Sequence, residues 1–101
     1  MPNAYFGADH AGFQLKESLK RLLDEGKTRA VGVSNVTLAQ LEAFAAECQL
    51  SAYQPPYNML QRDIELDTLP WCVEHNVAVV IYWPLLKGLL AGKLPREHVF
   101  P

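Results

Sequence analysis

The feature that most constrains the fold of this chain is a regular alternation between short apolar runs and segments with helical periodicity. Four apolar runs typical of β-strands occupy residues 4–6, 29–33, 51–54 and 77–82. Three segments between them carry apolar residues at the spacing of one helix face. Because short loops join these elements, the crossovers are expected to be right-handed and the strands parallel. The sequence therefore predicts an α/β fold with a four-stranded parallel sheet of βα units.

The predicted sheet is compatible with two architectures. Four such strands form either half of a TIM barrel or a small flavodoxin-like open sheet. No linker or repeat divides the chain, so residues 1–101 are predicted to form a single α/β domain. The run at residues 77–82 is continuously apolar, as expected for a strand covered on both faces. Residues 94–101 show no periodicity and are predicted to be a tail that is ordered only when it docks.

Local signals mark the ends of the first two predicted helices. Gly26 supplies a stop for the first helix, and the buried face of that helix is predicted to comprise Leu15, Leu19, Leu22 and Leu23. Thr37 and Gln40 have the spacing of a capping box at the start of the second helix. The buried face of the second helix is predicted to comprise Leu38, Leu41, Phe44, Ala45 and Cys48.

The third predicted helix begins near a proline and ends at His75. Pro70 is tolerated only in the first turn of a helix, so Asp67 or Thr68 is expected to cap it. The strand at residues 77–82 follows directly.

Composition excludes several classes of function. The net charge is -2 and the pI is about 5.8, so the basic surface needed for nucleic-acid binding is not expected. No apolar run approaches the roughly 20 residues that cross a bilayer. Residues 1–10 do not have the pattern of a signal peptide, and Cys48 and Cys72 are expected to be reduced core residues. We therefore predict a cytoplasmic protein that binds neither nucleic acid nor membranes.

An isolated half-barrel would leave one apolar face of its sheet uncovered. Soluble monomers rarely expose large apolar patches, because such patches associate. We therefore expect the chain to form a homo-oligomer, a dimer or larger, by closing two halves or packing sheet on sheet.

Three ordered motifs resemble the cofactor-binding C-terminal half of the aldo-keto reductases. Residues 24–35 read Asp-Glu-Gly-Lys-Thr-Arg-Ala-Val-Gly-Val-Ser-Asn, and residues 53–58 read Tyr-Gln-Pro-Pro-Tyr-Asn. The third motif begins Ile-Tyr-Trp-Pro-Leu at residue 81 and ends with Lys-Gly-Leu-Leu-Ala-Gly-Lys at residues 87–93. The resemblance covers residues 17–93 and implies the fifth, sixth and seventh strands of a barrel.

The opening of the chain resembles a different family. Residues 7–17 read Gly-Ala-Asp-His-Ala-Gly-Phe-Gln-Leu-Lys-Glu, which is similar to the start of the ribose-5-phosphate isomerase B and galactose-6-phosphate isomerase family. This resemblance covers residues 1–26 and overlaps the first one within a helix. We therefore predict a chimera, natural or engineered, in which an isomerase-like βα unit (residues 1–26) precedes an aldo-keto-reductase-like βαβαβ unit (residues 27–93) and a tail (residues 94–101).

The reductase resemblance implies a nicotinamide site. In that family the residues matching Ser34, Asn35 and Gln54 hydrogen-bond the nicotinamide carboxamide, and the residue matching Tyr82 stacks on the ring. Carboxyl ends of parallel strands are where an α/β site belongs. A structural alternative stays open: Ser34 and Asn35 also suit a strand-to-helix turn, and Tyr82 also suits the end of a buried strand.

The remaining parts of either active site are not expected in this chain. The resemblance places the catalytic Tyr, Asp, Lys and His of the reductases on earlier strands, and Trp83 replaces a common Ser near the pyrophosphate. In the isomerases the residues matching Asp9 and His10 bind sugar phosphate, but here they also suit a helix-capping loop with a solvated imidazole. No catalytic residue and no metal site are predicted.

Three functional hypotheses follow. The first is a non-catalytic, self-associating hybrid domain that requires no cofactor. The second is a module with vestigial NADP or NAD binding, or sugar-phosphate binding. The third is an oxidoreductase or isomerase completed by oligomerisation, in which Asp9, His10 and Lys27 would be the first candidates for catalysis.

Overall fold

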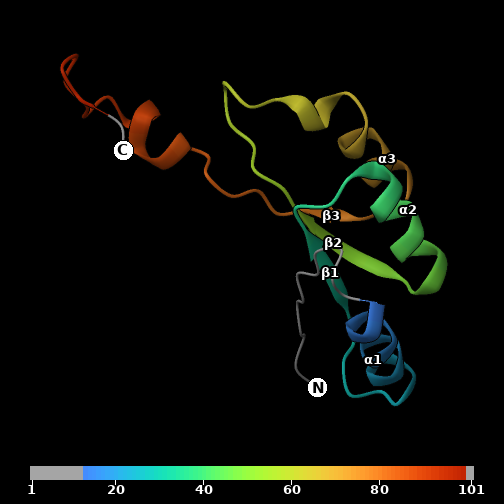
Figure 1. The fold of residues 1–101 in the computed structure, drawn as a ribbon. Coiled ribbons are helices and arrows are strands. Elements are labelled where there is room, and N and C mark those ends of the chain that lie inside the picture. Colours follow the sequence, from blue (N-terminus) through green and yellow to red (C-terminus); the bar gives the residue numbers. More distant parts are fainter. Residues whose placement is uncertain (1–12, 100–101) are drawn as a thin grey trace.

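The computed structural model of the chain describes residues 13–99, apart from the side chains of residues 13–16 and 19. Figure 1 shows the elements in chain order: α1 (Phe13–Asp24), β1 (Val31–Ser34), α2 (Leu38–Glu47), β2 (Leu50–Gln54), the 3₁₀ helix η1 (Asp63–Glu65), α3 (Thr68–Glu74), β3 (Ala78–Val79) and the 3₁₀ helix η2 (Leu86–Ala91). The predicted strand at residues 4–6 lies outside the described residues. The described sheet therefore has three strands, and the fourth stays a prediction.

The sheet is parallel, and its strands keep the order of the sequence, β1-β2-β3. Its register defines two crosswise rows that point to opposite faces because side chains alternate along a strand: Val33, Tyr53 and Val79 in one row, and Gly32, Ala52 and Ala78 in the other. Helices α2 and α3 lie on the same side of the sheet (Figure 1), as right-handed crossovers between sequential parallel strands require. The predicted α/β class and parallel sheet are confirmed.

The core fills the space between the sheet and the helices α2 and α3. Its buried members are Val31, Val33, Val36, Leu41, Leu50, Tyr53, Trp71, Cys72 and Val77. The predicted face of α2 is confirmed, since Leu41 is buried and its other members pack against this core: Leu38, Phe44, Ala45 and Cys48. Both cysteines are free thiols, and Cys72 is fully buried.

The predicted helix ends are confirmed in atomic detail. Gly26 has a φ of 70°, which glycine adopts without the steric cost of a Cβ. The amide of Lys27 donates to the carbonyl of Leu22 across this residue, which closes α1. At the start of α2, Thr37 and Gln40 form the reciprocal bonds of a capping box.

Helix α3 begins at Thr68, and the side chain of Asp67 caps it, one of the two predicted caps. Its end repeats the motif seen at Gly26. Asn76 has a φ of 55°, and the amide of Val77 donates to the carbonyl of Cys72 at 2.8 Å. Asparagine is among the few non-glycine residues that tolerate this conformation.

The predicted strand over residues 77–82 is wrong in length, because β3 comprises only Ala78 and Val79. The amide of Val80 still donates to Tyr53, and the amide of Tyr82 donates to Pro55. In a parallel ladder the amide of residue 55 would bond the carbonyl of Val80 between these two rungs, but proline has no N–H. The ladder is therefore interrupted at Pro55 and resumes as an isolated bridge between Pro56 and Tyr82.

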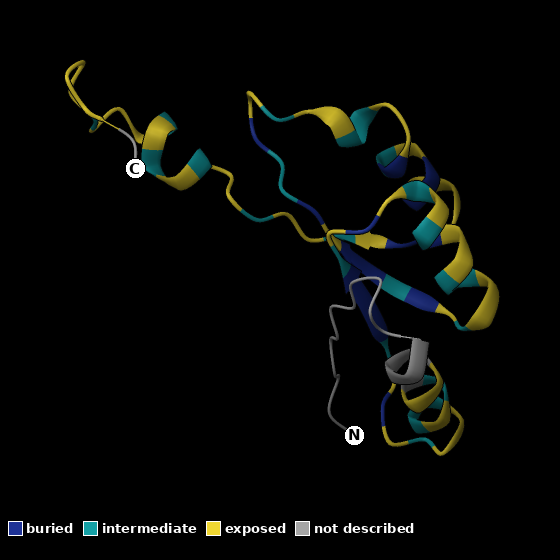
Figure 2. Cartoon of the chain, in the orientation of Figure 1, coloured by how far each residue is buried: buried dark blue, intermediate teal, exposed yellow. Residues whose placement is uncertain are grey.

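Beyond Trp83 the chain leaves the sheet as a segment that we call the C-terminal arm (residues 84–99). Figures 1 and 2 show it extending away from the strands with mostly exposed residues. The molecule is accordingly elongated, with a radius of gyration of 16.2 Å, against about 13 Å for a compact domain of this length. Leu85, near the start of the arm, is exposed. The arm includes residues 94–99 of the predicted tail.

The large exposed apolar side chains do not lie where we expected them, on an uncovered face of the sheet. The described face opposite the helices carries the small row that contains Gly32 and Ala52. The large exposed residues near it follow β3 instead: Val80, Ile81, Trp83, Leu85 and Leu89. Within residues 13–99 no helix is both long and apolar enough to span a membrane.

Candidate functional site

The four residues predicted to contact a nicotinamide meet at the carboxyl ends of the strands. Ser34 ends β1 and Gln54 ends β2, and the two are register partners. The hydroxyl of Ser34 donates to the backbone carbonyl of Gln54 at 2.8 Å, and the amide of Asn35 donates to the same carbonyl at 3.4 Å. The hydroxyl of Tyr82 donates to Oδ1 of Asn35, a residue 47 positions earlier. Two neighbouring strands and the chain segment after β3 thus contribute to one cluster.

Asn35 occupies the sharp turn between β1 and α2. Its φ of 55° lies in the left-handed region that asparagine tolerates better than most residues. Val36, the next residue, is buried, and its carbonyl accepts a hydrogen bond of 3.0 Å from the hydroxyl of Tyr53. Burial raises the pKa of Tyr53, so this hydroxyl stays a donor across the ordinary pH range. The buried Tyr53 therefore holds the turn in place through its hydroxyl.

Tyr82 is held through its backbone on both sides. Its amide donates to Pro55 at 3.0 Å, and its carbonyl accepts from the amide of Tyr57 at 3.2 Å. Its ring meets the ring of Trp83 edge to face at 5.0 Å. The ammonium of Lys87 lies over the Trp83 ring, 4.3 Å from its centre. Tyr82 thus joins the sheet to the base of the C-terminal arm.

The alternative in which Ser34 serves the strand-to-helix turn by bonding the backbone holds in part. Its hydroxyl does bond a backbone group, but that group belongs to β2 and is a carbonyl, while Thr37 caps α2. Ser34 is half-buried, and Asn35 and Gln54 are exposed. The cluster is therefore accessible to a ligand and is not consumed by helix capping.

Of the other candidate residues, the structure describes only Lys27, which does not join this cluster. Asp9 and His10 lie outside the described residues, so their assignment stays a prediction. Lys27 precedes the amino end of β1, at the opposite end of the strand from Ser34. The ammonium of Lys27 lies 2.5 Å from the carboxylate of Glu25. The hydrogen bond between them lowers the pKa of Glu25. Lys27 is therefore not positioned to act with the cluster at the other end of the sheet.

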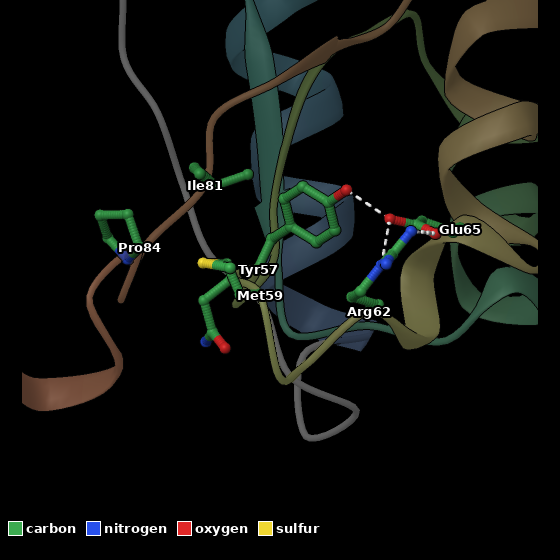
Figure 3. A pocket seen from close by; sticks show the side chains of 7 residues that line it. Tyr57, Met59, Arg62, Glu65, Ile81 and Pro84 are labelled. Atoms are coloured by element: carbon green, nitrogen blue, oxygen red, sulfur yellow. Dashed lines mark hydrogen bonds and ion pairs between the residues drawn. The ribbon is translucent and has the colours of Figure 1, made fainter. Parts of the chain in front are cut away.

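A pocket that the sequence did not reveal lies beside the cluster. It has a volume of about 370 Å³ and opens between the loop after β2 and the chain that leaves β3 (Figure 3). Apolar walls come from Met59, Ile81 and Pro84. Tyr57, Arg62 and Glu65 form its polar side.

The polar side of the pocket is a closed network. The hydroxyl of Tyr57 donates to Oε1 of Glu65 at 2.5 Å, and Arg62 binds both oxygens of that carboxylate at 2.9 Å. The bond to Arg62, then that to Tyr57, lowers the pKa of Glu65. The bond to Glu65 in turn raises the pKa of Tyr57 and of Arg62. The i,i+3 spacing of Arg62 and Glu65 could have suggested a pair, but the contact with Tyr57 depends on the fold of the loop.

Asn58 connects this loop to the chain segment that follows β3. Its side-chain oxygen accepts from the amides of Leu60 and Gln61, each at 3.0 Å. Its Nδ2 donates to the carbonyl of Trp83 at 3.2 Å. In the sequence Asn58 is only part of a motif. Its role in connecting the loop to the segment at Trp83 depends on the fold.

The described residues form no group of three or more His, Cys, Asp or Glu side chains that could hold a metal ion. The cluster instead offers hydroxyl and amide groups together with an aromatic ring. Hydroxyl and amide groups both donate and accept hydrogen bonds, and a tyrosine ring provides a flat apolar face. These groups fit a planar ring that bears an amide, which is the chemistry of nicotinamide.

Comparison with known proteins gives matches to a family model and to individual proteins. Residues 9–99 match the model of the aldo/keto reductase family. The chain is 40% identical over 84 residues to Aldo-keto reductase YhdN of Bacillus subtilis, which covers 83% of this chain and 25% of that protein. It is 36% identical over 81 residues to the NADH-specific methylglyoxal reductase of Escherichia coli, with 80% and 25% covered.

Two solved structures have the same fold over nearly the whole chain. The glycerol dehydrogenase AKR11B4 of Gluconobacter oxydans superposes with a TM-score of 0.80 at 39% identity, covering 96% of this chain and 30% of that one. An aldo/keto reductase of Klebsiella pneumoniae, solved in complex with NADP and acetate, gives 0.68 at 31% identity and covers 93% and 35%. This likeness favours the half-barrel architecture over the flavodoxin-like one.

The chain spans about a quarter of the length of the curated relatives it matches. The family match begins at residue 9 and overlaps the stretch that resembles the isomerases, whose separate origin stays a prediction. The motifs after β1, β2 and β3, the sequential parallel sheet and the extent of the match agree: this chain belongs to the aldo/keto reductase family.

Proposed function

We propose that this chain is the part of an aldo-keto reductase that holds the nicotinamide end of NADP or NAD. Ser34, Asn35 and Gln54 bind the carboxamide, and Tyr82 stacks on the ring. The observation that carries the proposal is the bonding of these residues into one accessible cluster at the carboxyl ends of β1 and β2, with Tyr82 from the segment after β3. Two similar proteins are described as NADH-specific and as bound to NADP.

The affinity of this chain for the dinucleotide is expected to be weak. The cluster engages one ring and its amide, so most of the ligand surface stays in water. Binding must also offset the lost translational and rotational freedom of the ligand. We therefore expect a Kd between about 10 µM and 1 mM, equivalent to roughly 4 to 7 kcal/mol.

The direct test is a titration of the full chain with NADP and NAD, followed by amide NMR. Signals of residues 34, 35, 54 and 82 should shift together and saturate, while those of α1 should not move. Tyr82→Ala removes the stacking face and should weaken binding about tenfold. Tyr57→Ala removes a neighbouring tyrosine of the pocket network and serves as the matched control. An unchanged spectrum at millimolar dinucleotide would contradict the proposed function.

We also propose that the chain is non-catalytic in isolation and self-associates. The support is the edge of β3, which pairs with no further strand among the described residues and is followed by exposed apolar side chains at Val80, Ile81, Trp83 and Leu85. Unpaired strand edges and contiguous apolar surface both favour association. Residues that supply a catalytic acid would come from another chain or from a longer form of this protein.

Light scattering over a concentration series tests self-association. A dimer that dissociates on dilution is expected, and Ile81→Lys should shift it to monomer by placing a charge on the open edge. Val99→Lys in the exposed arm adds the same charge away from that edge and should leave the mass unchanged. A monomer at every concentration would refute this second proposal.

The isomerase-like start supports a third, narrower proposal. Asp9 and His10 would bind a sugar phosphate if that stretch keeps its parental role. A titration with ribose 5-phosphate should then shift the resonances of these two residues. Loss of this response in Asp9→Asn with retention of the dinucleotide response would separate the two sites, and no response in the unmodified chain would rule this site out.

A further inference from the structure

The pocket between the loop after β2 and the start of the C-terminal arm is suited to an aliphatic side chain. Met59, Ile81 and Pro84 form apolar walls around about 370 Å³ (Figure 3). The cavity left by one core leucine is on the order of 150 Å³, so the pocket has room for one or two leucine side chains. The carboxylate of Glu65 on its polar side is already paired with Arg62. The pocket therefore favours an apolar group over a charged one.

The 3₁₀ helix η2 of the C-terminal arm carries such groups. It reads Leu-Lys-Gly-Leu-Leu-Ala, none of its residues is buried, and Leu89 is exposed. Leu86 and Lys87 have left-handed φ values of 46° and 53°, a conformation that non-glycine residues keep only where surrounding structure enforces it. The shape and the apolar surface of η2 are therefore those of a segment that packs on a further surface.

The arm is not placed to fill the pocket of its own copy. Pro84 lines the pocket and is also the first residue of the arm, which extends away from the sheet (Figure 1). To turn back, η2 would have to reverse within two residues and break the bond of 2.9 Å from the amide of Leu86 to the carbonyl of Trp83. A two-fold axis near Pro84 instead places each arm over the pocket of a second copy, because an isologous contact exchanges the two surfaces.

The charges of the two surfaces are complementary. Residues 28–79 carry six Asp or Glu and two Lys or Arg side chains, a net charge of -4, whereas the arm carries three Lys or Arg and one Glu, a net charge of +2. Exposed Asp63 and Asp67 lie in the segment that follows the pocket loop, and exposed Lys93 follows η2. Opposite charges steer and orient an encounter. Contact of an arm with a sheet-and-helix body is therefore favoured over contact between two bodies.

We propose that the C-terminal arm of each copy docks on a second copy of this chain, with Leu89 of η2 in the pocket formed by Met59, Ile81 and Pro84. The exchange is reciprocal, so each dimer contains two identical contacts. Docking removes Leu89 from water and supplies the surface that holds the left-handed residues of η2. The inference rests on the proposed self-association and names the two surfaces that meet.

Two single variants of the full chain and their mixture test the exchange by light scattering. Leu89→Asp places a carboxylate on η2, and Met59→Asp places one in the pocket. Each should raise the Kd of the dimer at least about tenfold, because docking would bury an unpaired charge. Both side chains are exposed in the single copy, so circular dichroism should show that both variants stay folded. Val99→Asp adds the same charge to the arm beyond η2 and should keep the Kd of the parent chain.

The equimolar mixture of Leu89→Asp and Met59→Asp decides between exchange and other dimers. A dimer with one copy of each variant keeps one unmodified contact, between Leu89 of one copy and Met59 of the other. The mixture should therefore associate more tightly than either variant alone. A mixture no tighter than the variants, or a Kd for Leu89→Asp equal to that of the parent chain, would overturn the inference while the self-association of the parent stands. A parent chain that is monomeric at every concentration would refute both proposals.

Isotope-filtered NMR locates the contact without a variant. Chain labelled at its methionine and isoleucine methyl groups is mixed with unlabelled chain, and the sequence has only two residues of each type. Methyl groups of Met59 and Ile81 should then show intermolecular NOEs to leucine methyls. A dimer whose intermolecular NOEs do not involve these two methyl groups would contradict docking of η2 in the pocket.

Discussion

Two regions of the described chain differ in how their apolar side chains are packed. Residues 28–79, which we call the packed body, contain the sheet, α2, α3 and the buried core. The C-terminal arm is richer in leucine, with five in 16 residues against six in 52, but Leu85 is 53% exposed whereas Leu41 of α2 is fully buried. Figure 2 shows this contrast as dark strands beside a largely exposed arm. Apolar composition alone therefore does not make a core; the residues must also face another layer.

Backbone geometry separates the two regions as well. In the packed body the left-handed residues Asn35 and Asn76 are asparagines, the type that tolerates this conformation. At the base of the arm and within it the left-handed residues other than glycine are Trp83, Leu86 and Lys87, whose types do not tolerate it well. Strain of this kind persists only where surrounding structure enforces it. The arm conformation is therefore the part of the fold that depends most on a further surface to hold it.

The largest expected effect separates two leucines. Leu41→Ala creates a cavity beneath α2 and should lower the free energy of unfolding by about 3 kcal/mol, enough to unfold a marginal domain. Leu85→Ala removes a side chain that is mostly in water and should change it by less than about 0.5 kcal/mol. Urea denaturation followed by the fluorescence of buried Trp71 measures both. Equal losses would show that the arm is packed as tightly as the body.

A smaller loss is expected at the cap of α2. Thr37→Ala removes the side chain that accepts from the amide of Gln40 and should cost about 1 kcal/mol. Thr37→Ser keeps the hydroxyl and should restore most of this stability. By contrast η2 in the arm begins at Leu85 with no side-chain cap, so Leu85→Ser should not lower the unfolding midpoint. Denaturant midpoints of the three variants decide whether capping matters only where a helix is packed.

The packed body was also the region that the sequence predicted well. The Thr37–Gln40 pair and the apolar face of α2 are local signals, as is Gly26 just before this body, and local contacts realise them. The strand at residues 77–82 failed because its end depends on residues 24 or more positions earlier: Pro55 removes a rung that no pattern within the strand reveals. Apolar periodicity reports what a segment can bury, whereas ladder bonds depend on the neighbouring strand.

The candidate site divides in the same way. The positions of Ser34, Asn35 and Gln54 at strand ends could be predicted, because parallel strands bring their carboxyl ends to one edge. The bond from Tyr82 to Asn35 could not, since it requires the left-handed turn at Asn35 and the path of the chain after β3. The Tyr57–Glu65–Arg62 network was missed for a similar reason. Which atom of a polar side chain is free for a ligand is decided by such tertiary bonds.

The same backbone change should have opposite consequences in the two regions. Asn76 and Lys87 have nearly equal φ values, 55° and 53°. Asn76→Gly relieves strain at the end of α3 and should raise the free energy of unfolding by about 0.5 kcal/mol. Lys87→Gly also removes the ammonium that lies over the Trp83 ring. It should leave global unfolding unchanged while increasing the amide exchange of η2, because the arm opens locally. A shift of the global midpoint by Lys87→Gly would mean that the arm unfolds together with the body.

The smallest expected effect concerns acid. Hydrogen bonds from Arg62 and Tyr57 lower the pKa of Glu65, so the network contributes its full stability above the ordinary glutamate value of about 4.3 and loses it as pH falls through the lower folded value. Below that pH the loop that lines the pocket should loosen, while the contact of Lys87 with Trp83 has no carboxylate and should persist. NMR titration of the Glu65 side chain measures the shift, and Arg62→Gln should move its midpoint upward. A midpoint at the ordinary value in the parent chain would mean that the Tyr57–Glu65–Arg62 network is open in solution, and the loop would then behave like the arm.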